Sequence, residues 1–187
     1  MKDIFSIKGK VALVTGGSRG IGEMIAAGFL ASGAKVYISS RKAEICDATA
    51  KRLAKEFEGE CISIPTDLAN INGIEFLANE VTKKESKLDI LINNVGGGGR
   101  WGNEDMITTK DEVWDQVYYK NFIVAKDLIK MFLPSMLKNE WGRVITITSS
   151  LAKQAGGRPW FNVAKMSQTV LMKNLAKNSL YSSKGVT

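Results

Sequence analysis

Short apolar runs alternate along this sequence with longer segments in which apolar residues recur at helical spacing. The apolar runs lie at residues 11–14, 36–38, 61–64, 88–92 and 144–147. Helices are predicted from Ile21 to a stop at Gly33, and over 45–57, 74–81, 121–138 and 160–183. Runs that are apolar throughout indicate strands covered on both faces. The order therefore predicts an α/β fold: a doubly wound parallel sheet in a three-layer α/β/α arrangement.

The chain is predicted to be one domain over residues 1–187. Its 187 residues are 44% hydrophobic, enough for one buried core. No repeat, low-complexity tract or linker divides it, and the glycine run 96–99 is its one loose segment. Because ligands bind beyond the carboxyl ends of parallel strands, chemistry is expected after the first, second, fourth and fifth strands.

Composition removes several chemistries. The sequence has no histidine, which excludes histidine-based triads, histidine metal ligands and an imidazole pH switch. Its two cysteines, Cys46 and Cys61, form no metal-binding pattern and are predicted to be buried thiols, so no metal site is expected. The N-terminal segment lacks the apolar stretch of a secretion signal, and no apolar run is long enough to span a bilayer. We therefore expect a soluble cytoplasmic protein.

A glycine-rich turn separates the first strand from the first helix. Gly16, Gly20 and Gly22 fall at this turn. Glycines there let the chain turn tightly and let a pyrophosphate approach amide groups at the positive end of the helix. An ordinary tight turn is the alternative, but a glycine triplet between a strand and a helix of a βαβ unit is typical of the Rossmann type of dinucleotide-binding fold.

Five further elements lie in order after this turn. Asp67 follows the third strand, residues 93–96 (Asn-Asn-Val-Gly) follow the fourth, and Asn121 lies in a helix. Ser149 follows the fifth strand, and Lys165 lies in the last helix. With the TGxxxGxG spacing of the turn, this series resembles the short-chain dehydrogenase/reductase family. The family counterparts are an adenine-contacting acid, the NNAG element, the catalytic Asn, the catalytic Ser and the Lys of the YxxxK motif.

The resemblance implies a nicotinamide dinucleotide site, and charge favours NADP(H) as its occupant. An acid at the end of the second strand usually holds a 2′-hydroxyl, but Ser40 and Arg41 stand there, and Arg19 lies in the glycine turn. Guanidinium groups pair with phosphate in a fork and stay charged, although both arginines could instead be solvated surface residues. The predicted cofactor-binding residues are Gly16, Ser18, Arg19, Gly20, Ile21, Gly22, Ser40, Arg41, Asp67, Leu68, Asn94, Gly96 and Lys165.

The catalytic Tyr of the family has no counterpart here. The resemblance implies a Tyr phenol that protonates the substrate carbonyl, a Lys four residues later that binds the nicotinamide ribose and favours the phenolate, a Ser that hydrogen-bonds the substrate, and an Asn in a proton relay. Four residues before Lys165 the sequence has Phe161, which has no proton to give. The predicted catalytic positions are Asn121, Ser149, Phe161 and Lys165. Three explanations stay open: an engineered Tyr-to-Phe change, a natural variant with altered chemistry, or a dead enzyme kept as a binder.

Two functions follow from the resemblance. The first is an NADPH-dependent carbonyl reductase similar to 3-oxoacyl-(acyl-carrier-protein) reductases, acting on a small carbonyl or acyl-thioester substrate, with activity impaired or altered by Phe161. The second is an NADP-binding pseudoenzyme or regulatory protein without redox turnover. Nucleic-acid binding, suggested by the net charge of +7, is not expected because the basic residues are not interleaved with aromatic residues.

The C-terminal part carries three further expectations. Residues 151–187 hold six cations and no acid, a charge that could face an acidic carrier protein or be a solvated helix face. Residues 185–187 fall where family members begin a sixth strand, so strands six and seven are expected to be absent and the strand 144–147 to have an unpaired apolar edge. Either the chain is a fragment of a longer product, or a partner chain covers that edge.

Assembly and substrate choice are the last expectations. The apolar helices 121–138 and 160–183 are expected to pack against the same helices of another subunit in a homodimer or homotetramer; an intrachain core is the alternative. The loop 97–105, which contains Arg100 and Trp101, is expected to help select the substrate, as its counterpart does in the family.

Overall fold

A computed structural model of the chain describes residues 5–103 and 105–187. Two parts of the chain lie outside the described residues. They are residues 1–4, part of the N-terminal segment in which we predict no secretion signal, and residue 104, part of the predicted substrate loop 97–105. Within the described ranges, no helix combines the length and the apolar character that a membrane crossing requires.

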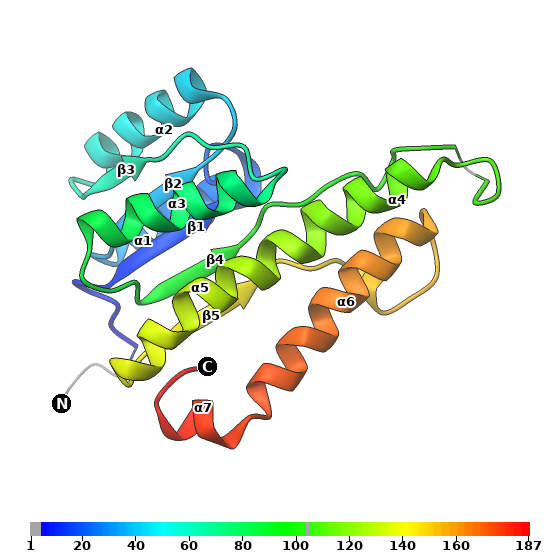
Figure 1. The fold of residues 1–187 in the computed structure, drawn as a ribbon. Helices are drawn as coiled ribbons and strands as arrows, with labels where there is room; N and C mark the ends of the chain where they lie inside the picture. The colour runs from blue at the N-terminus through cyan, green and yellow to red at the C-terminus, as the bar shows by residue number, and fades with distance from the viewer. Residues whose placement is uncertain (1–4, 104) are drawn as a thin grey trace.

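Five parallel strands form one sheet in the order β3-β2-β1-β4-β5 (Figure 1). The strands are β1 (Val11–Thr15), β2 (Lys35–Ser39), β3 (Cys61–Ser63), β4 (Ile90–Asn93) and β5 (Arg143–Thr146). From β1 the chain builds the sheet outward to β3, then crosses back to add β4 and β5 on the other side of β1. This doubly wound order confirms the predicted fold class and opens a crevice at the carboxyl ends of β1 and β4.

Helices cover both faces of the sheet. They are α1 (Gly20–Ala31), α2 (Ala43–Glu56), α3 (Ile71–Lys84), α4 (Asp111–Tyr118), the π-helical η1 (Tyr119–Ile123), α5 (Val124–Lys138), the 3-10 turn η2 (Ser150–Ala152), α6 (Pro159–Ala176) and α7 (Ser179–Ser183). One apolar cluster joins the sheet to α1 and α2, and a second joins it to α3, α5 and the C-terminal part of α6. The first half of α6 packs beside α4, beyond the carboxyl ends of the strands (Figure 1).

The central strand supplies side chains to both apolar clusters. Val11 and Leu13 of β1 belong to the cluster under α3 and α5, whereas Ala12 and Val14 belong to the cluster under α1 and α2. All four side chains are buried. Because successive side chains of a strand point to opposite faces, a strand with helices on both faces must be apolar at every position. The apolar runs of the sequence are explained by this burial.

The helices between β4 and the C-terminus differ from the prediction. The predicted helix 160–183 is wrong as a single element, because α6 ends at Ala176 and α7 begins at Ser179. The Asn178 side chain accepts a hydrogen bond from the Leu180 amide at 3.0 Å, and such a cap starts a new helix. Before Asn121, α4 adds a helix that the apolar pattern did not predict, and η1 joins it to α5.

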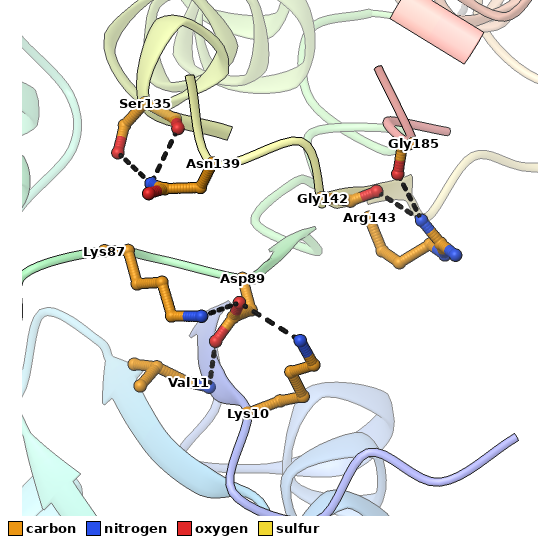
Figure 2. A network of polar contacts seen from close by, with 9 residues as sticks. All are labelled: Lys10, Val11, Lys87, Asp89, Ser135, Asn139, Gly142, Arg143 and Gly185. Carbon is orange, nitrogen blue, oxygen red and sulfur yellow. Dashed lines mark hydrogen bonds and ion pairs between the residues drawn. The ribbon is translucent and has the colours of Figure 1, made fainter. Parts of the chain in front are cut away.

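The outer edge of β5 is paired at its start, so the prediction of an unpaired edge is wrong for these residues. Val186 forms a parallel bridge with Gly142, and the Thr187 carbonyl accepts a hydrogen bond from the Val144 amide at 2.8 Å. Arg143 donates from Nη1 to the carbonyl oxygens of Gly142 and Gly185 at 2.7 and 2.8 Å (Figure 2). These contacts hold the C-terminal residues against the first half of β5.

A buried carboxylate joins β1 to β4 at the amino ends of the strands. Asp89 is 1% exposed and accepts a hydrogen bond from the Val11 amide at 3.0 Å (Figure 2). The Lys10 and Lys87 ammonium groups lie 3.6 and 3.2 Å from its Oδ1 atom. A buried charge is tolerated only when it is paired and hydrogen-bonded, and Asp89 meets both conditions. This network lies at the end of the sheet opposite the crevice.

The two cysteines are free thiols with little reactivity. Cys46 is buried, as predicted, whereas Cys61 is only partly buried. Burial raises the pKa of the Cys46 thiol and raises the pKa of Cys61 to about 11. Since the thiolate is the reactive form, neither side chain is a candidate nucleophile at neutral pH.

Candidate functional site

A cleft of about 810 Å³ opens at the carboxyl ends of the strands. Its walls come from the segments that follow β1, β2, β3 and β4, together with the end of α4 and the start of η1. Its lining residues are Gly16, Ser18, Arg19, Ser39, Ser40, Arg41, Lys42, Ile45, Thr66, Asp67, Leu68, Ala69, Asn94, Val95, Gly96, Trp101, Asp115, Gln116, Tyr119 and Lys120. Nine of the thirteen predicted cofactor-binding residues are thus brought together; Gly20, Ile21, Gly22 and Lys165 lie outside the lining.

The glycine turn forms a close-packed floor at the start of α1. Gly16 has a φ of +66°, which favours glycine. A Cβ atom at Gly22 would collide with the carbonyl oxygen of Gly16 and with Nδ2 of Asn94, so α1 can approach the turn only with glycine there. The N-cap residue of α1, Arg19, makes no side-chain hydrogen bond to the first turn, so the amide groups there can meet an anion.

Asn94 holds this turn against β4. Its Nδ2 atom donates hydrogen bonds to the carbonyl oxygens of Thr15 and Gly16, at 2.9 and 3.3 Å. The Thr15 hydroxyl in turn accepts hydrogen bonds from the amides of Asn94 and Val95, at 3.0 and 3.1 Å. These hydrogen bonds join the ends of β1 and β4 where the cleft begins, and they explain why an asparagine stands at residue 94.

The cleft is electrically positive. Four cationic side chains line it, Arg19, Arg41, Lys42 and Lys120, against two carboxylates, Asp67 and Asp115. At the end of β2 the Ser40 Oγ atom is buried next to the Cys46 thiol and makes no hydrogen bond of good geometry to a described residue. A buried hydroxyl without a partner is rare unless a ligand or water completes it. The cleft is thus built for an anionic, hydrogen-bonding ligand.

A second group of predicted residues converges on the glycine run 96–99. A Cβ atom at Gly96 would lie 2.8 Å from Oδ1 of Asn121 and 3.0 Å from Nζ of Lys165. A Cβ atom at Gly99 would lie 3.3 Å from Cγ of Phe161. The structure therefore brings Asn121, Phe161 and Lys165 to the same short loop at the end of β4.

Asn121 is held by the backbone around it. Its Oδ1 atom accepts a hydrogen bond from the Gly97 amide at 3.1 Å, and its Nδ2 atom donates to the carbonyl oxygens of Gly97 and Val117 at 2.7 and 2.8 Å. Asn121 lies within η1, and single π-helical turns inside α-helices occur frequently at functional sites. The fully buried amide fixes the glycine run relative to α4.

Lys165 is a buried amine that hydrogen-bonds one group among the described residues. The residue is 5% exposed, and its Nζ atom donates a hydrogen bond to the Ile147 carbonyl at 2.9 Å. Burial lowers the pKa of Lys165 from 10.5 to about 8. The site therefore holds a cation at neutral pH in a place that disfavours it, and an anion or hydroxyl groups of a ligand would stabilise that charge.

Phe161 occupies the position where the resemblance implies a phenol. Its ring packs against the apolar cluster of Val117, Trp160 and Ala164, and Nζ of Lys165 lies 5.9 Å from the ring centroid. Ser149 precedes η2, which packs on α6, and its Oγ atom accepts a hydrogen bond from the Leu151 amide at 3.2 Å. The ring is in place to contact a ligand beside Lys165, but it can neither donate nor accept a proton.

The loop that follows the glycine run is attached to the start of α6. Arg158 donates from Nη1 to the carbonyl oxygens of Trp101, Gly102 and Asn103. The Thr109 hydroxyl accepts a hydrogen bond from the Asn103 amide at 3.0 Å. The predicted substrate loop therefore lies next to Phe161, and one side chain holds it there.

Sequence reasoning missed part of the cleft. Some missed residues adjoin predicted ones and could have been found from their place after a strand: Ser39, Lys42, Ile45, Thr66, Ala69 and Val95. Others come from the unpredicted helix or from the loop: Trp101, Asp115, Gln116, Tyr119 and Lys120. Asp115 and Gln116 had no signal because α4 is too polar for its apolar spacing to stand out, and Trp101 was predicted only as part of the substrate loop.

Fold and site together define a doubly wound, Rossmann-type α/β protein with an anion-binding crevice at its topological switch point. A family model described as short chain dehydrogenase matches residues 10–187. The chain belongs to the short-chain dehydrogenase/reductase family.

Three similar proteins illustrate this membership. A rhamnolipids biosynthesis 3-oxoacyl-(acyl-carrier-protein) reductase of Pseudomonas aeruginosa is 39% identical over 161 residues, covering 84% of this chain and 61% of the relative. The 3-oxoacyl-(acyl-carrier-protein) reductase FabG of Escherichia coli is 32% identical over 183 residues, covering 97% of this chain and 71% of the relative. The solved structure of a Pseudomonas aeruginosa RhlG/NADP active-site complex has a TM-score of 0.88 and 34% identity, covering 100% of this chain and 73% of that one. The chain thus spans less than two thirds of the first relative's length.

Proposed function

We propose that this chain binds NADP(H) in the positive cleft, as the cofactor-binding part of a short-chain carbonyl reductase. The observation that carries the proposal is the cleft itself: a floor where only glycine fits, four cationic side chains, and a buried serine hydroxyl without a good partner at the end of β2. The similar RhlG structure is an NADP complex, which supports the same choice.

Residues at the end of β2 select the cofactor in this proposal. NAD-binding Rossmann folds usually place a carboxylate there for the 2′-hydroxyl, and a carboxylate would repel a 2′-phosphate. Ser40 and Arg41 occupy this place, and Arg19 also lines the cleft. Two guanidinium groups and a free hydroxyl suit a phosphate, so NADP(H) should bind more tightly than NAD(H).

The chain's own groups would orient the reduced end of the cofactor, which supplies a hydride when bound. Lys165 would bind the nicotinamide ribose with its buried ammonium, and Asn121 would keep the glycine run in place beside it. Ser149 would hydrogen-bond a substrate carbonyl of a small ketone or an acyl thioester. Phe161 fills the place of a proton donor and contributes none.

The absence of a phenol at residue 161 also favours a second candidate, an NADP-binding protein without redox turnover. General acid catalysis commonly contributes a factor of about 10² to 10⁴. Losing that factor would leave cofactor binding intact and reduce ketone reduction to a trace. The two candidates share the cleft and differ only in turnover.

Restoring the phenol separates the two candidates. NADPH oxidation with a panel of ketones and 3-oxoacyl thioesters should rise by about 10² to 10⁴ in Phe161→Tyr relative to the parent. Phe161→Leu, which also lacks a hydroxyl, is the matched control and should show no gain. Calorimetric titration should give the same NADP⁺ affinity for all three proteins.

The results also decide the proposal. If no ketone is reduced faster by Phe161→Tyr than by Phe161→Leu, the damaged-reductase candidate is wrong and the binding protein remains. Tighter binding of NAD⁺ than of NADP⁺ by the parent would overturn the cofactor assignment.

A further inference from the structure

Lys120 is a cation of the cleft that the resemblance does not account for. It lies in η1 directly before Asn121, and the two neighbours point to different surroundings. Asn121 is buried among backbone groups of the glycine run, whereas Lys120 is partly buried and lines the cleft. The π-helical turn thus places one side chain in the protein interior and the next one over the ligand space.

The Lys120 ammonium group has no polar partner within the part of the chain that the structure describes. With none of the residues in 5–103 and 105–187 does it form a hydrogen bond or an ion pair. Its Nζ atom lies 4.9 Å from the centroid of the Trp101 ring, which also lines the cleft. An ammonium that rests on an aromatic ring inside a cleft keeps its charge available, because the ring replaces water without neutralising it.

The charges around Lys120 are unbalanced. Burial and the nearby Arg41 and Arg19 guanidinium groups lower its pKa, and Asp67 opposes them. The Asp67 carboxylate also accepts a hydrogen bond from the Ala69 amide at 3.1 Å, so part of its charge is already stabilised by the backbone next to it. Repulsion among these three cations raises the free energy of the unliganded protein, and a bound anion that contacts all three would relieve it.

We propose that Lys120 is a third phosphate-binding cation of this cleft. In the complex with NADP(H), its ammonium group would move off the Trp101 ring and pair with the 2′-phosphate that Arg19 and Arg41 also bind. The inference rests on the proposed NADP(H) function and adds to it a specificity residue on a different wall. The 2′-phosphate is the anion chosen, because the two arginines whose fields reach Lys120 are the pair assigned to it. The pyrophosphate has the free amides of α1 for its partners.

Substitution of Lys120 tests the assignment by comparing two cofactors. Calorimetric titration of Lys120→Met should show NADP⁺ affinity reduced about tenfold or more, as expected for loss of one charge-assisted contact, with NAD⁺ affinity changed less than about twofold. Lys120→Arg keeps the cation and should retain most of the NADP⁺ affinity. Lys130→Met removes an exposed lysine of α5 and should change neither affinity.

A merely structural role for Lys120 predicts a different pattern. If the lysine only packs on the indole, Lys120→Met and Trp101→Phe should lower the melting temperature alike and leave the NADP⁺ to NAD⁺ ratio unchanged, and that result overturns the inference. Equal loss of both affinities in Lys120→Met would place the lysine at a shared group and overturn it as well. If the parent protein binds neither nucleotide, it is the proposed function that fails.

Discussion

At the scale of single residues, Lys165 makes the stability of the folded state depend on pH. Its ammonium is buried, and its pKa falls from 10.5 to about 8 on folding. A fall of that size corresponds to about 3 kcal/mol against the folded state below pH 8. Between pH 8 and 10.5 the unfolded chain binds the extra proton, so this penalty shrinks as the pH rises and is gone above 10.5.

Lys165→Met should reveal that dependence. The substitution removes the penalty and also the hydrogen bond to Ile147, but only the penalty varies with pH. The quantity to compare is the free energy of unfolding of the variant minus that of the parent. This difference should be more positive at pH 7 than at pH 9.5, by roughly 2 kcal/mol. Urea unfolding at both values measures the difference, and Lys153→Met, an exposed lysine, serves as the control. A difference that stays constant with pH would show that the amine keeps its ordinary pKa in the folded chain.

The residues of the cleft were predictable where chain geometry forces one amino acid. Gly22 must lack a side chain because the Gly16 carbonyl takes its place, and that requirement is visible as glycine spacing. Lys120 was not predictable, because its role depends on a π-helical turn and on the ring of a residue 19 positions away in the sequence. A charged residue becomes part of a site through the residues that lie near it in space, and the local sequence does not reveal these.

At the scale of elements, one arginine connects the loop after β4 to α6. Arg158 has no carboxylate partner among the described residues. Its Nη1 atom donates hydrogen bonds to three carbonyl oxygens of the loop. Arg158→Met should loosen the loop, because the substitution removes the three hydrogen bonds from Nη1 and leaves these carbonyl groups to bind water. Hydrogen exchange of amides 98–103 should accelerate about tenfold or more while the amides of β1 and β4 keep their protection.

A control locates the effect in this contact. Arg100→Met removes an exposed cation of the same loop and should leave exchange unchanged. If Arg158→Met also leaves the exchange of 98–103 at the parent rate, other contacts, such as the hydrogen bond between Asn103 and Thr109, hold the loop.

Elements were predictable in proportion to their burial. Every strand and the helices α1, α2, α3 and α5 have apolar positions that face the sheet, so their spacing is regular in the sequence. In α4 only Val117 is buried, and the helix escaped detection. The break between α6 and α7 depends on one capping side chain, Asn178. The apolar spacing continues across it, so the sequence predicts a single helix over 160–183.

At the scale of the whole molecule, the sheet order follows from the sequence but its outer edges do not. Alternating strands and helices with right-handed crossovers leave few arrangements of five parallel strands. The pairing of Val186 with Gly142 was missed because it depends on the turn after α7, which the apolar pattern does not describe. The sequence likewise does not show what covers the surface of α6 that faces away from the sheet.

An apolar stripe on α6 supports the expected association of two copies of the chain. Val163, Met166 and Val170 lie on one helical face and are 49%, 49% and 50% exposed. Such a stripe beside an otherwise polar surface is typical of a self-complementary interface. The expected homo-oligomer would bury these side chains against the same helix of a second copy.

Met166→Lys should therefore weaken self-association. A lysine in the centre of the stripe would meet its own copy across a two-fold axis, and each buried like charge opposes the contact. Light scattering after size exclusion should give a dimer or tetramer for the parent and a smaller species for the variant at the same concentration. Met24→Lys places the same change on α1, where Met24 is 65% exposed, and should leave the parent's mass unchanged. A parent that is monomeric at high concentration, or a variant with the parent's mass, would assign the stripe to another role.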